Sequence, residues 1–404
     1  MKLIYQISVL SYSSLIHIAS FFNPKAKQWV EGRKNIFNLI ASTIKPSDKI
    51  AWFHCASLGE FEQGKPVIEG FKKKYPDHKI LITFFSPSGY ELRKNYGNAD
   101  YVFYLPIDTK KNAKKFIKTI QPNVAFFVKY EFWNFYLEEL FNKKIPTYLI
   151  SGVFRKNQLF FKWYGAWYKK MLAYFNHFFL QNKASENLLK EIGYSNATIS
   201  GDTRFDRVYE NSLSPEELPI IKAFKSDQKI IIGGSSWPEE ENILAKYYQS
   251  NQSNFKLIIA PHNISENHIQ QIEKLFNNNC IRHSEATLKN IGTQNVLIID
   301  NIGILSNIYQ YTDIALIGGG FTGALHNILE PTSFGNTIFF GPKHQKFHEA
   351  QNLINAGGAI TISTEFDFAK SINEIIPKLD IIKKQNIAFI ANNKGATNII
   401  LSKV

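Results

Sequence analysis

Short apolar runs alternate with amphipathic stretches along most of the chain, and this alternation limits the possible fold more than any other feature. Six runs in the first half have the length and hydrophobicity of buried strands, at residues 49–54, 79–85, 101–104, 123–128, 147–150 and 177–181. Five more follow, at residues 229–233, 256–260, 296–299, 314–317 and 337–340. Apolar strands separated by helices are typical of a parallel sheet covered on both faces. The sequence therefore predicts two α/β domains.

A segment of different composition separates the two series of strands. Residues 209–228 contain two prolines and many polar side chains, which is typical of a linker. We predict an N-terminal domain at 23–208, a linker at 209–228, and a C-terminal domain at 229–404 that ends in helices. Ligands of open α/β sheets bind beyond the carboxyl ends of the strands, so we expect a cleft between the two domains.

The charge of the chain is concentrated in its first half. Residues 1–204 contain 30 Lys and Arg against 15 Asp and Glu, whereas residues 205–404 contain 17 against 19. A one-sided basic surplus indicates an anionic partner, which is nucleic acid, acidic lipid or a phosphorylated substrate. Composition does not choose among them. Two distant cysteines, Cys55 and Cys280, have no metal-ligand spacing, so we expect neither a disulfide framework nor a zinc site.

The first 22 residues form an apolar segment with one charged residue, Lys2. The segment lacks the basic start and the cleavage site of a secretory signal. Three alternatives remain: a helix lying in the membrane interface, a helix spanning the membrane, or a helix covering the first domain. The basic residues that follow the segment would keep the main body on the cytoplasmic side.

Two turns and one acidic residue in the first half are candidates for chemistry. In WFHCASLGEFEQGKP, Ser57 and Glu60 have the spacing of a helix capping box, and Gly59 lies between them. The functional alternative is that Glu60 takes a proton from an acceptor hydroxyl. In TFFSPSGYE, Ser86 and Ser88 lie in a turn that either binds an anion or simply begins a helix. Glu131, at the end of an apolar strand, needs a partner such as a lysine, or a task.

The second half offers three segments with small or polar residues after predicted strands. In IIIGGSSWPEEEN, Ser235 and Ser236 lead into a helix and are a plausible phosphate cradle or a plain cap. His262 follows the next strand. In ALIGGGFTGALHNILEPTSFG, the triplet Gly318, Gly319 and Gly320 indicates a close approach to the backbone, and Asn327 and Glu330 have capping-box spacing. The triplet does not match the dinucleotide or P-loop fingerprints, so NAD or ATP chemistry is not predicted.

Taken in order, the segments SLGEFEQGKP, TFFSPSGYE, LPID, YEFW, SGDTRFD, GGSSWPEEE, APH, DNIGIL and HNILEP make the chain resemble the 3-deoxy-D-manno-octulosonic acid (Kdo) transferases. The resemblance runs along nearly the whole chain. It implies a GT-B architecture of two Rossmann-like domains with a central cleft, preceded by a membrane-associating N-terminal helix. It also implies CMP-Kdo as donor substrate, a phosphorylated lipid A precursor as acceptor, and no cofactor or metal. The expected location is the cytoplasmic face of the bacterial inner membrane, where the basic half would meet an anionic lipid surface rather than nucleic acid.

The resemblance also implies roles for individual residues. Glu60 matches the general base of an inverting transfer, and Glu131 matches a second acidic position. The donor-binding matches are Ser235, Ser236, His262, Ile302, Gly303, Gly318, Gly319, Gly320, Asn327 and Glu330. The acceptor-side matches are Ser57, Gly59, Ser86, Ser88 and Arg204.

Some positions depart from the pattern of the family. Pro261 stands where Arg often precedes His262, so the resemblance supplies no arginine for the CMP phosphate there. The other departures are Lys129, Asp202, Ile304 and Arg204. Two alternatives to Kdo transfer stay open: another GT-B nucleotide-sugar transferase or epimerase, and a non-catalytic GT-B-like protein that binds anionic lipid.

Overall fold

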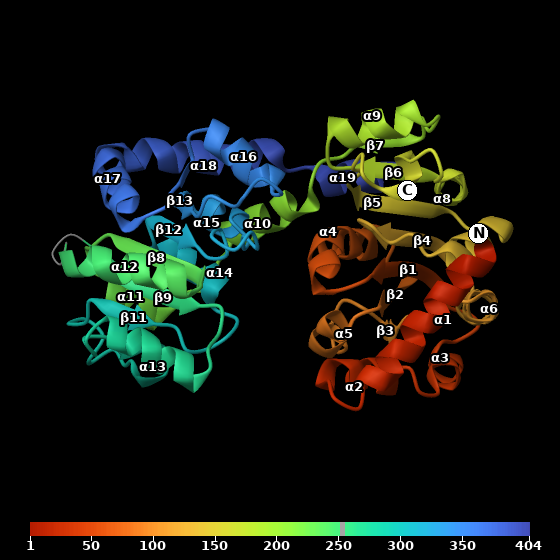
Figure 1. Cartoon of the computed structure of the whole chain (residues 1–404), viewed down its shortest axis with the longest axis horizontal. Helices are drawn as coiled ribbons and strands as arrows, with labels where there is room; N and C mark the ends of the chain where they lie inside the picture. Colours follow the sequence, from red (N-terminus) through yellow and green to blue (C-terminus); the bar gives the residue numbers. More distant parts are fainter. Residues whose placement is uncertain (251–254) are drawn as a thin grey trace. The chain divides into compact units, whose positions relative to one another are not determined.

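The computed structural model describes residues 1–250 and 255–404 and divides into two compact units. Unit 1 consists of residues 1–206 and 394–404, and unit 2 consists of residues 207–393 (Figure 1). The chain therefore leaves unit 1 after Asp206 and returns to it at Lys394. Unit 2 is an insertion into unit 1, close to the end of the chain.

Unit 1 is built on a seven-stranded parallel sheet in the order β3-β2-β1-β4-β5-β6-β7. Its strands are β1 (Lys49–Cys55), β2 (His78–Phe84), β3 (Tyr101–Tyr104), β4 (Pro122–Val128), β5 (Thr147–Gly152), β6 (His177–Leu180) and β7 (Ala197–Ile199). Neighbouring residues of β1 face opposite sides: Trp52 belongs to one buried cluster and Phe53 to another. Both faces of the sheet are therefore covered, as the continuous apolar strands predict.

Helices of unit 1 follow the strands and pack on both faces of the sheet. They are α1 (Lys2–Ala19), α2 (Pro24–Glu31), α3 (Ile36–Thr43), α4 (Leu58–Lys74), α5 (Pro87–Arg93), α6 (Lys110–Ile120), α7 (Asn134–Asn142), α8 (Ala166–Leu172), α9 (Lys183–Glu191), the start of α10 (Thr203–Leu213) and α19 (Ala396–Ser402). Because every strand pair is parallel, all carboxyl ends of the strands lie at one edge of the sheet. That edge is where the candidate residues of unit 1 are found.

Unit 2 has a second parallel sheet in the order β10-β11-β9-β8-β12-β13-β14. Its strands are β8 (Ile230–Ser236), β9 (Lys256–Pro261), β10 (Ile281–Arg282), β11 (Val296–Ile298), β12 (Ile314–Ile317), β13 (Thr337–Phe340) and β14 (Ala359–Thr361). Its helices include α11 (Pro219–Lys225), α12 (Pro238–Ser250), α13 (Glu266–Leu275), α14 (Leu305–Ile308), α15 (Leu329–Ser333), α16 (His348–Asn355), α17 (Glu365–Ile375) and α18 (Leu379–Asn393). The prediction of two α/β domains with parallel sheets is confirmed.

The domain boundaries differ from the predicted ones at two places. Residues 209–228 are not a free linker, because they contain α11, whose Ile221 and Phe224 are fully buried in unit 2. The predicted C-terminal domain at 229–404 also loses its last helix. Residues Ile400 and Leu401 of α19 belong to a core cluster of unit 1. Burial of apolar side chains, rather than chain order, decides which unit a helix joins.

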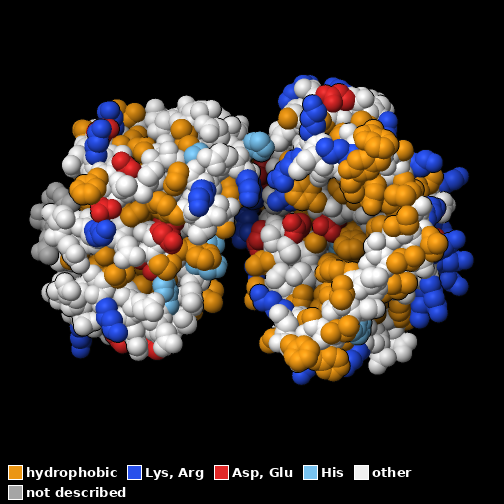
Figure 2. Space-filling model, in the orientation of Figure 1, with side chains coloured by type: hydrophobic (Ala, Val, Ile, Leu, Met, Phe, Trp, Pro, Cys, Tyr) orange, Lys and Arg blue, Asp and Glu red, His pale blue; other side chains and the backbone are white. Residues whose placement is uncertain are grey.

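The N-terminal helix α1 is tied to unit 1 by a few side chains and leaves much apolar surface exposed. The Tyr5 hydroxyl donates to Oδ2 of Asp108 at 2.6 Å, and the ring of Tyr12 stacks on Phe85 at 6.0 Å. The exposed apolar residues of α1 and the turn after it are Leu3, Ile4, Ile7, Leu10, Tyr12, Leu15, Ile18, Phe21 and Phe22. Figure 2 shows hydrophobic side chains on the face of unit 1 where Figure 1 places α1. Within the described part of the chain, no helix combines the length and hydropathy that crossing a membrane requires.

Candidate functional site

Glu60 lies in the first turn of α4, directly after the carboxyl end of β1. Ser57 is the N-cap residue, and it forms a capping box with Glu60. The main-chain N–H of Ser57 donates to Oε2 of Glu60 at 3.2 Å, and the Ser57 hydroxyl donates to the same oxygen. Within residues 1–250 and 255–404, Oε1 of Glu60 has no hydrogen bond. One oxygen therefore caps the helix, and the partly exposed carboxylate keeps the other for a different partner.

Main-chain hydrogen bonds hold the turn after β2 beside this cap. The carbonyl oxygen of Ala56 accepts from the N–H groups of Phe85 and Ser86, at 3.1 and 2.7 Å. A Cβ atom on Gly89 would lie 3.0 Å from the carbonyl carbon of Ser57, so only glycine fits this approach without displacement. Ser86 caps α5 by accepting from the N–H of Ser88 at 3.3 Å. The structure thus brings Ser86 and Ser88 next to the Ser57–Glu60 turn.

Glu131 follows β4 and is buried among aromatic side chains, with 9% of its surface exposed. Its Oε2 lies 3.2 Å from Nε2 of His54 and accepts from Nε1 of Trp133 at 2.6 Å. The lysine partner that the sequence suggested for Glu131 is therefore replaced by a histidine and an indole. Two hydrogen bonds hold this carboxylate in one position.

His54 is itself fixed by a buried hydrogen-bond chain. Its side chain is fully buried, and its Nδ1 lies 2.9 Å from Oγ1 of Thr83, which accepts from Nε1 of Trp52 at 2.8 Å. Every donor of this chain is used if the Thr83 hydroxyl donates to Nδ1 and Nε2–H donates to Glu131. The chain Trp52–Thr83–His54–Glu131 crosses β1, β2 and the end of β4.

Both carboxylates act on the buried Cys55 of β1. Burial raises the pKa of the Cys55 thiol well above its usual value, and the charges of Glu60 and Glu131 raise it further. Burial and then Glu60 also raise the pKa of Tyr130, against the effect of Arg155, whose guanidinium lies 5.5 Å from the Tyr130 ring centre. Loops after β1, β4 and β5 therefore meet around Glu60. Sequence reasoning missed His54, Thr83, Tyr130, Trp133 and Arg155, although the first four of these stand within the segments that it selected.

Arg204 lies at the start of α10, close to the first turns of α4. Its Nε and Nη2 donate to Oδ2 of Asp202 at 2.9 and 2.6 Å. The neighbouring Thr203 hydroxyl donates to the carbonyl oxygen of Gln63 at 2.5 Å. The Asp202 that departs from the family pattern is thus the ion-pair partner of Arg204.

In unit 2, the first candidate turn joins β8 to α12. Ser235 has a positive φ of 49°, and the hydroxyl of the buried Ser236 donates to Oε1 of Glu241 at 3.1 Å. The fully buried Glu240 accepts from the N–H groups of Trp237 and Gly319, at 3.1 and 3.0 Å. Burial raises the pKa of Glu240 to about 7, although these N–H groups oppose the shift. Glu240, which the sequence did not single out, joins this turn to the glycine triplet.

The glycine triplet after β12 is required because neighbouring main-chain atoms of the same unit pack closely against it. A Cβ on Gly318 would lie 1.9 Å from the carbonyl oxygen of Ser235, and one on Gly320 would lie 2.3 Å from the main-chain nitrogen of Gly341. Gly319 has a φ of 85°, a left-handed conformation that disfavours other residues. The close approach that the triplet predicted is therefore made by neighbouring backbone within unit 2.

His262 lies in a stack of three rings beside this turn. Its ring stacks on Trp237 at 5.2 Å between ring centres with an interplanar angle of 10°, and lies 4.6 Å from the ring of His326. Nε1 of Trp237 donates to Nε2 of His326 at 3.1 Å. Burial and the neighbouring His262 lower the pKa of His326. The neutral ring is therefore the form that accepts the indole hydrogen bond.

Asn327 and Glu330 are brought together, but not as the predicted capping box. The helix α15 begins at Leu329, and its N-cap is the aliphatic Ile328. Asn327 instead donates to Oε1 of Glu330 at 3.0 Å and accepts from the N–H of Leu329 at 3.1 Å. Burial raises the pKa of Glu330, while Arg207 and Asn327 oppose the shift.

The remaining donor-side candidates lie farther along the same edge. Ile302 is 84% exposed in the loop between β11 and α14, and Gly303 has a φ of 104°. In the sheet, β9 separates β11 from β8. Across residues 1–250 and 255–404, no group of three or more His, Cys, Asp or Glu side chains could hold a metal ion.

The comparisons with known proteins agree on one family. Residues 31–207, nearly all of the first part of unit 1, match the model of 3-deoxy-D-manno-octulosonic-acid transferase (kdotransferase). Three relatives named 3-deoxy-D-manno-octulosonic acid transferase extend the match over both units. The one from Rickettsia felis is 24% identical over 85% of this chain and 76% of its own length. The one from Haemophilus influenzae is 25% identical over 90% and 86%, and the one from Aquifex aeolicus is 26% identical over 83% and 88%.

Over most of its length, the chain is therefore similar to Kdo transferases. Solved structures of other proteins share its fold. UDP-GlcNAc 2-epimerase from Neisseria meningitidis has a TM-score of 0.62 at 17% identity and covers 88% of this chain and 98% of its own. MurG from Acinetobacter baumannii has a TM-score of 0.56 at 10% identity, with coverage of 88% and 99%. At such identities the likeness concerns the fold alone.

Proposed function

We propose that this chain is a glycosyltransferase that transfers Kdo from CMP-Kdo to a phosphorylated lipid A precursor, in the biosynthesis of lipopolysaccharide. The similarity of the chain to Kdo transferases supports the transfer of Kdo. The observation that carries the mechanism is the position of Glu60, a carboxylate at a helix N-terminus with one oxygen used by the cap and one oxygen left over.

Glu60 acts as the general base in the proposed reaction. It takes the proton of an acceptor hydroxyl, whose oxygen attacks the anomeric carbon of Kdo. The bond between that carbon and the phosphate oxygen breaks, CMP leaves with the electron pair, and the configuration inverts. The N-terminus of α4 places main-chain N–H groups next to this carboxylate. Glu131, held by His54 and Trp133, adds a second fixed negative charge beside the Glu60 turn.

Unit 2 holds the donor in this proposal. Main-chain N–H groups at the turn of Ser235 and Ser236 would face the phosphate of CMP. The glycine turn at residues 318–320 and the Asn327–Glu330 pair would complete the donor side. Fixed N–H dipoles stabilise a departing phosphate without a cation, so we expect catalysis without a metal ion.

The expected place of the reaction is the cytoplasmic face of the bacterial inner membrane. Two features support this location. The helix α1 exposes apolar side chains, and residues 1–204 carry the whole basic surplus of the chain. Apolar burial in the interface and attraction to anionic lipid act together in membrane binding. We therefore expect α1 to lie on the membrane surface.

The test is CMP release from CMP-Kdo in the presence of a tetraacylated lipid A precursor, with the lipid products resolved by mass. Wild-type protein should release CMP and add Kdo to the lipid. Glu60→Gln should release CMP at least about a hundredfold more slowly. Glutamine serves a capping box as well as glutamate does, so this variant should keep its stability. A stable wild-type protein that turns over a uridine nucleotide sugar but not CMP-Kdo would contradict the assignment of CMP-Kdo as the donor substrate.

A further inference from the structure

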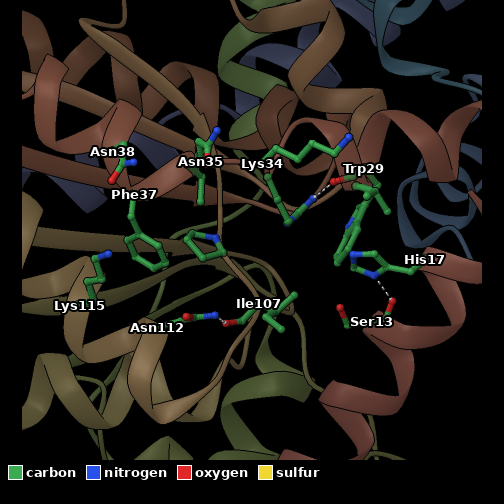
Figure 3. A pocket seen from close by; sticks show the side chains of 14 residues that line it. Ser13, His17, Trp29, Lys34, Asn35, Phe37, Asn38, Ile107, Asn112 and Lys115 are labelled. Carbon is green, nitrogen blue, oxygen red and sulfur yellow. Dashed lines mark hydrogen bonds between the residues drawn. The ribbon is translucent and has the colours of Figure 1, made fainter.

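A pocket of about 530 Å³ opens between three parts of unit 1, away from the residues around Glu60 (Figure 3). It is lined by the second half of α1, by the segment from α2 to α3, and by the loop from β3 into α6. The lining residues that matter here are His17, Trp29, Lys34, Asn35, Asn112 and Lys115. Figure 3 shows these side chains arranged around one cavity.

The pocket has the charge and hydrogen-bonding groups of an anion site. Lys34 and Lys115 are charged at neutral pH, and Asn35 and Asn112 supply amide groups. None of its fourteen lining residues, all within the described part of the chain, is an Asp or Glu. A concave surface lined by one sign of charge attracts the opposite sign.

Trp29 supplies a buried donor that has no partner. The residue is 4% exposed, and its Nε1–H makes no hydrogen bond within residues 1–250 and 255–404. A buried N–H without an acceptor is costly, commonly by about 1–3 kcal/mol. Trp29 lines the pocket, and an anion there would provide the missing acceptor once the side chains that cover Nε1 move aside.

Arg33 adds a buried charge at the back of the same pocket. Its guanidinium lies 3.9 Å from the Trp29 ring centre and donates to the carbonyl oxygens of Trp29, Phe85 and Leu105, at 3.1, 2.8 and 2.9 Å. Burial lowers its pKa to about 9, so it remains mostly protonated at neutral pH. Neutral carbonyls, rather than a carboxylate, hold this cation in place, and its positive field remains available to a ligand.

The helix that lines the pocket also determines what kind of anion fits. Ser13 and His17 of α1 line the cavity, while Leu10, Leu15 and Ile18 of the same helix are exposed. A small soluble anion would make no contact with these apolar side chains. A lipid would contact them, because its acyl chains can lie along them while its headgroup enters the pocket.

We infer that this pocket binds the phosphate headgroup of an anionic membrane lipid, with Lys34, Lys115 and the Trp29 N–H as its contacts. Binding of one headgroup would orient unit 1 on the membrane, which general attraction between charges does not do. Arg33 links the pocket to the turn after β2, because it donates to Phe85 next to Ser86. The inference deepens the proposed membrane location but does not depend on the Kdo transfer reaction.

The first experiment compares two double variants of full-length protein that lose the same charge. Lys34→Gln with Lys115→Gln alters the pocket. Lys25→Gln with Lys27→Gln is the control, because both lysines are exposed on α2 and neither lines the pocket. Binding is measured to phosphatidylcholine vesicles that contain about 20% phosphatidic acid. We expect the pocket pair to lose at least about tenfold more affinity than the control pair. Equal losses would overturn the inference, because diffuse attraction would then explain the binding.

The second experiment removes the donor without changing the charge. Trp29→Phe keeps an aromatic ring beside Arg33 but lacks Nε1–H, and it should weaken binding to the same vesicles about fivefold. Unchanged binding by a folded Trp29→Phe variant would contradict the proposed contact.

A third experiment tests whether the ligand of the pocket is a lipid headgroup or free phosphate. Short-chain phosphatidic acid below its micelle concentration should bind at least about tenfold more tightly than inorganic phosphate, because its chains add apolar contact. Equal affinities would overturn the lipid assignment. The CMP-release assay runs in parallel, so failure of the transferase proposal would be seen separately.

Discussion

Glu60 shows how one residue can satisfy a local rule and still be available for chemistry. The capping box with Ser57 would by itself account for an acidic residue at this position. The cap uses only Oε2, however, and glutamine would serve it equally well. Capping therefore explains the spacing of Ser57 and Glu60, but it does not require a titratable side chain at position 60.

Ser57→Ala should lower stability and preserve turnover, whereas Glu60→Gln should preserve stability and lower turnover. Loss of the Ser57 hydroxyl removes an N-cap acceptor and should lower the free energy of unfolding by about 1 kcal/mol. The Glu60 carboxylate remains, so CMP release should stay within about fivefold of wild type. Urea denaturation and the CMP-release assay measure the two effects. If Ser57→Ala reduced turnover as much as Glu60→Gln does, the assignment of Glu60 as the base would lose its support.

The lowered pKa of His326 predicts the direction in which pH changes the stability of unit 2. The pKa of its folded form is lowered, so the unfolded chain binds a proton first as the pH falls. The stability that neutral His326 contributes is present above its unfolded pKa of about 6.5 and is lost as the pH falls through its lower folded pKa. Protonation of Nε2 would also remove the hydrogen bond from Trp237.

Wild-type protein should therefore lose more stability than His326→Gln when the pH is lowered from about 7 to about 5. Glutamine keeps an acceptor for Trp237 but does not titrate in this range. Guanidinium unfolding at several pH values, followed by tryptophan fluorescence, measures the difference. Parallel losses in the two proteins would show that another group controls the pH dependence.

At the scale of elements, apolar runs predicted the interior strands and missed the shortest edge strands. β3, β12 and β13 begin and end at the predicted residues, whereas β7, β10 and β14 were not predicted. These three strands have two or three residues and lie at the edges of their sheets. An edge strand pairs on one side only and needs no continuous apolar run, so its pattern is weak.

The linker prediction was wrong for a related reason. Two prolines suggested a break, but Pro219 is the first residue of α11, a position where proline fits. The apolar pair Ile221 and Phe224, three residues apart, was the signal for a buried helix.

One acidic residue, Asp206, helps to attach α19 to unit 1. The buried carboxylate of Asp206 accepts from the N–H and the hydroxyl of Thr397, both at 2.8 Å, and from the N–H of Gly395. Asp206→Ala should lower the free energy of unfolding of unit 1 by about 2 kcal/mol, since a charged acceptor is lost. Hydrogen exchange should speed up in α19 and in the part of α4 around Gly70, which faces Leu401. The exposed Asp77 supplies the control, and Asp77→Ala should leave this exchange unchanged.

At the scale of the whole molecule, the order of motifs predicted the resemblance to Kdo transferases that the comparisons support, although each motif was weak. Motif residues lie on turns after neighbouring strands, and their order along the chain is that of the strands. The partners of these residues could not be predicted in the same way. Glu131 meets His54, and Glu240 meets Gly319, only because distant strands become neighbours in the sheet. The roles of the site residues remain predictions.

The whole-chain topology makes a final prediction, because unit 2 is an insertion whose ends lie together. Asp206 accepts a hydrogen bond from the N–H of Gly395, so the points where the chain leaves and re-enters unit 1 are adjacent. Replacing residues 207–393 by about four Gly and Ser residues should therefore give a folded unit 1 that retains α19. It should bind anionic vesicles as the full chain does, because it retains α1 and the basic surplus.

The matched control is the fragment 1–206, which lacks α19. Ile400 and Leu401 complete a core cluster with Phe71 and Ile68, so their removal should expose that cluster and destabilise the fragment by several kcal/mol, about 2 for each lost side chain. Thermal unfolding followed by circular dichroism compares the two proteins. Equal midpoints would mean that α19 is not an integral part of unit 1. A joined protein that fails to fold would mean that unit 1 needs unit 2 for its stability. A higher midpoint for the joined protein would establish that burial, rather than position in the chain, defines the first domain.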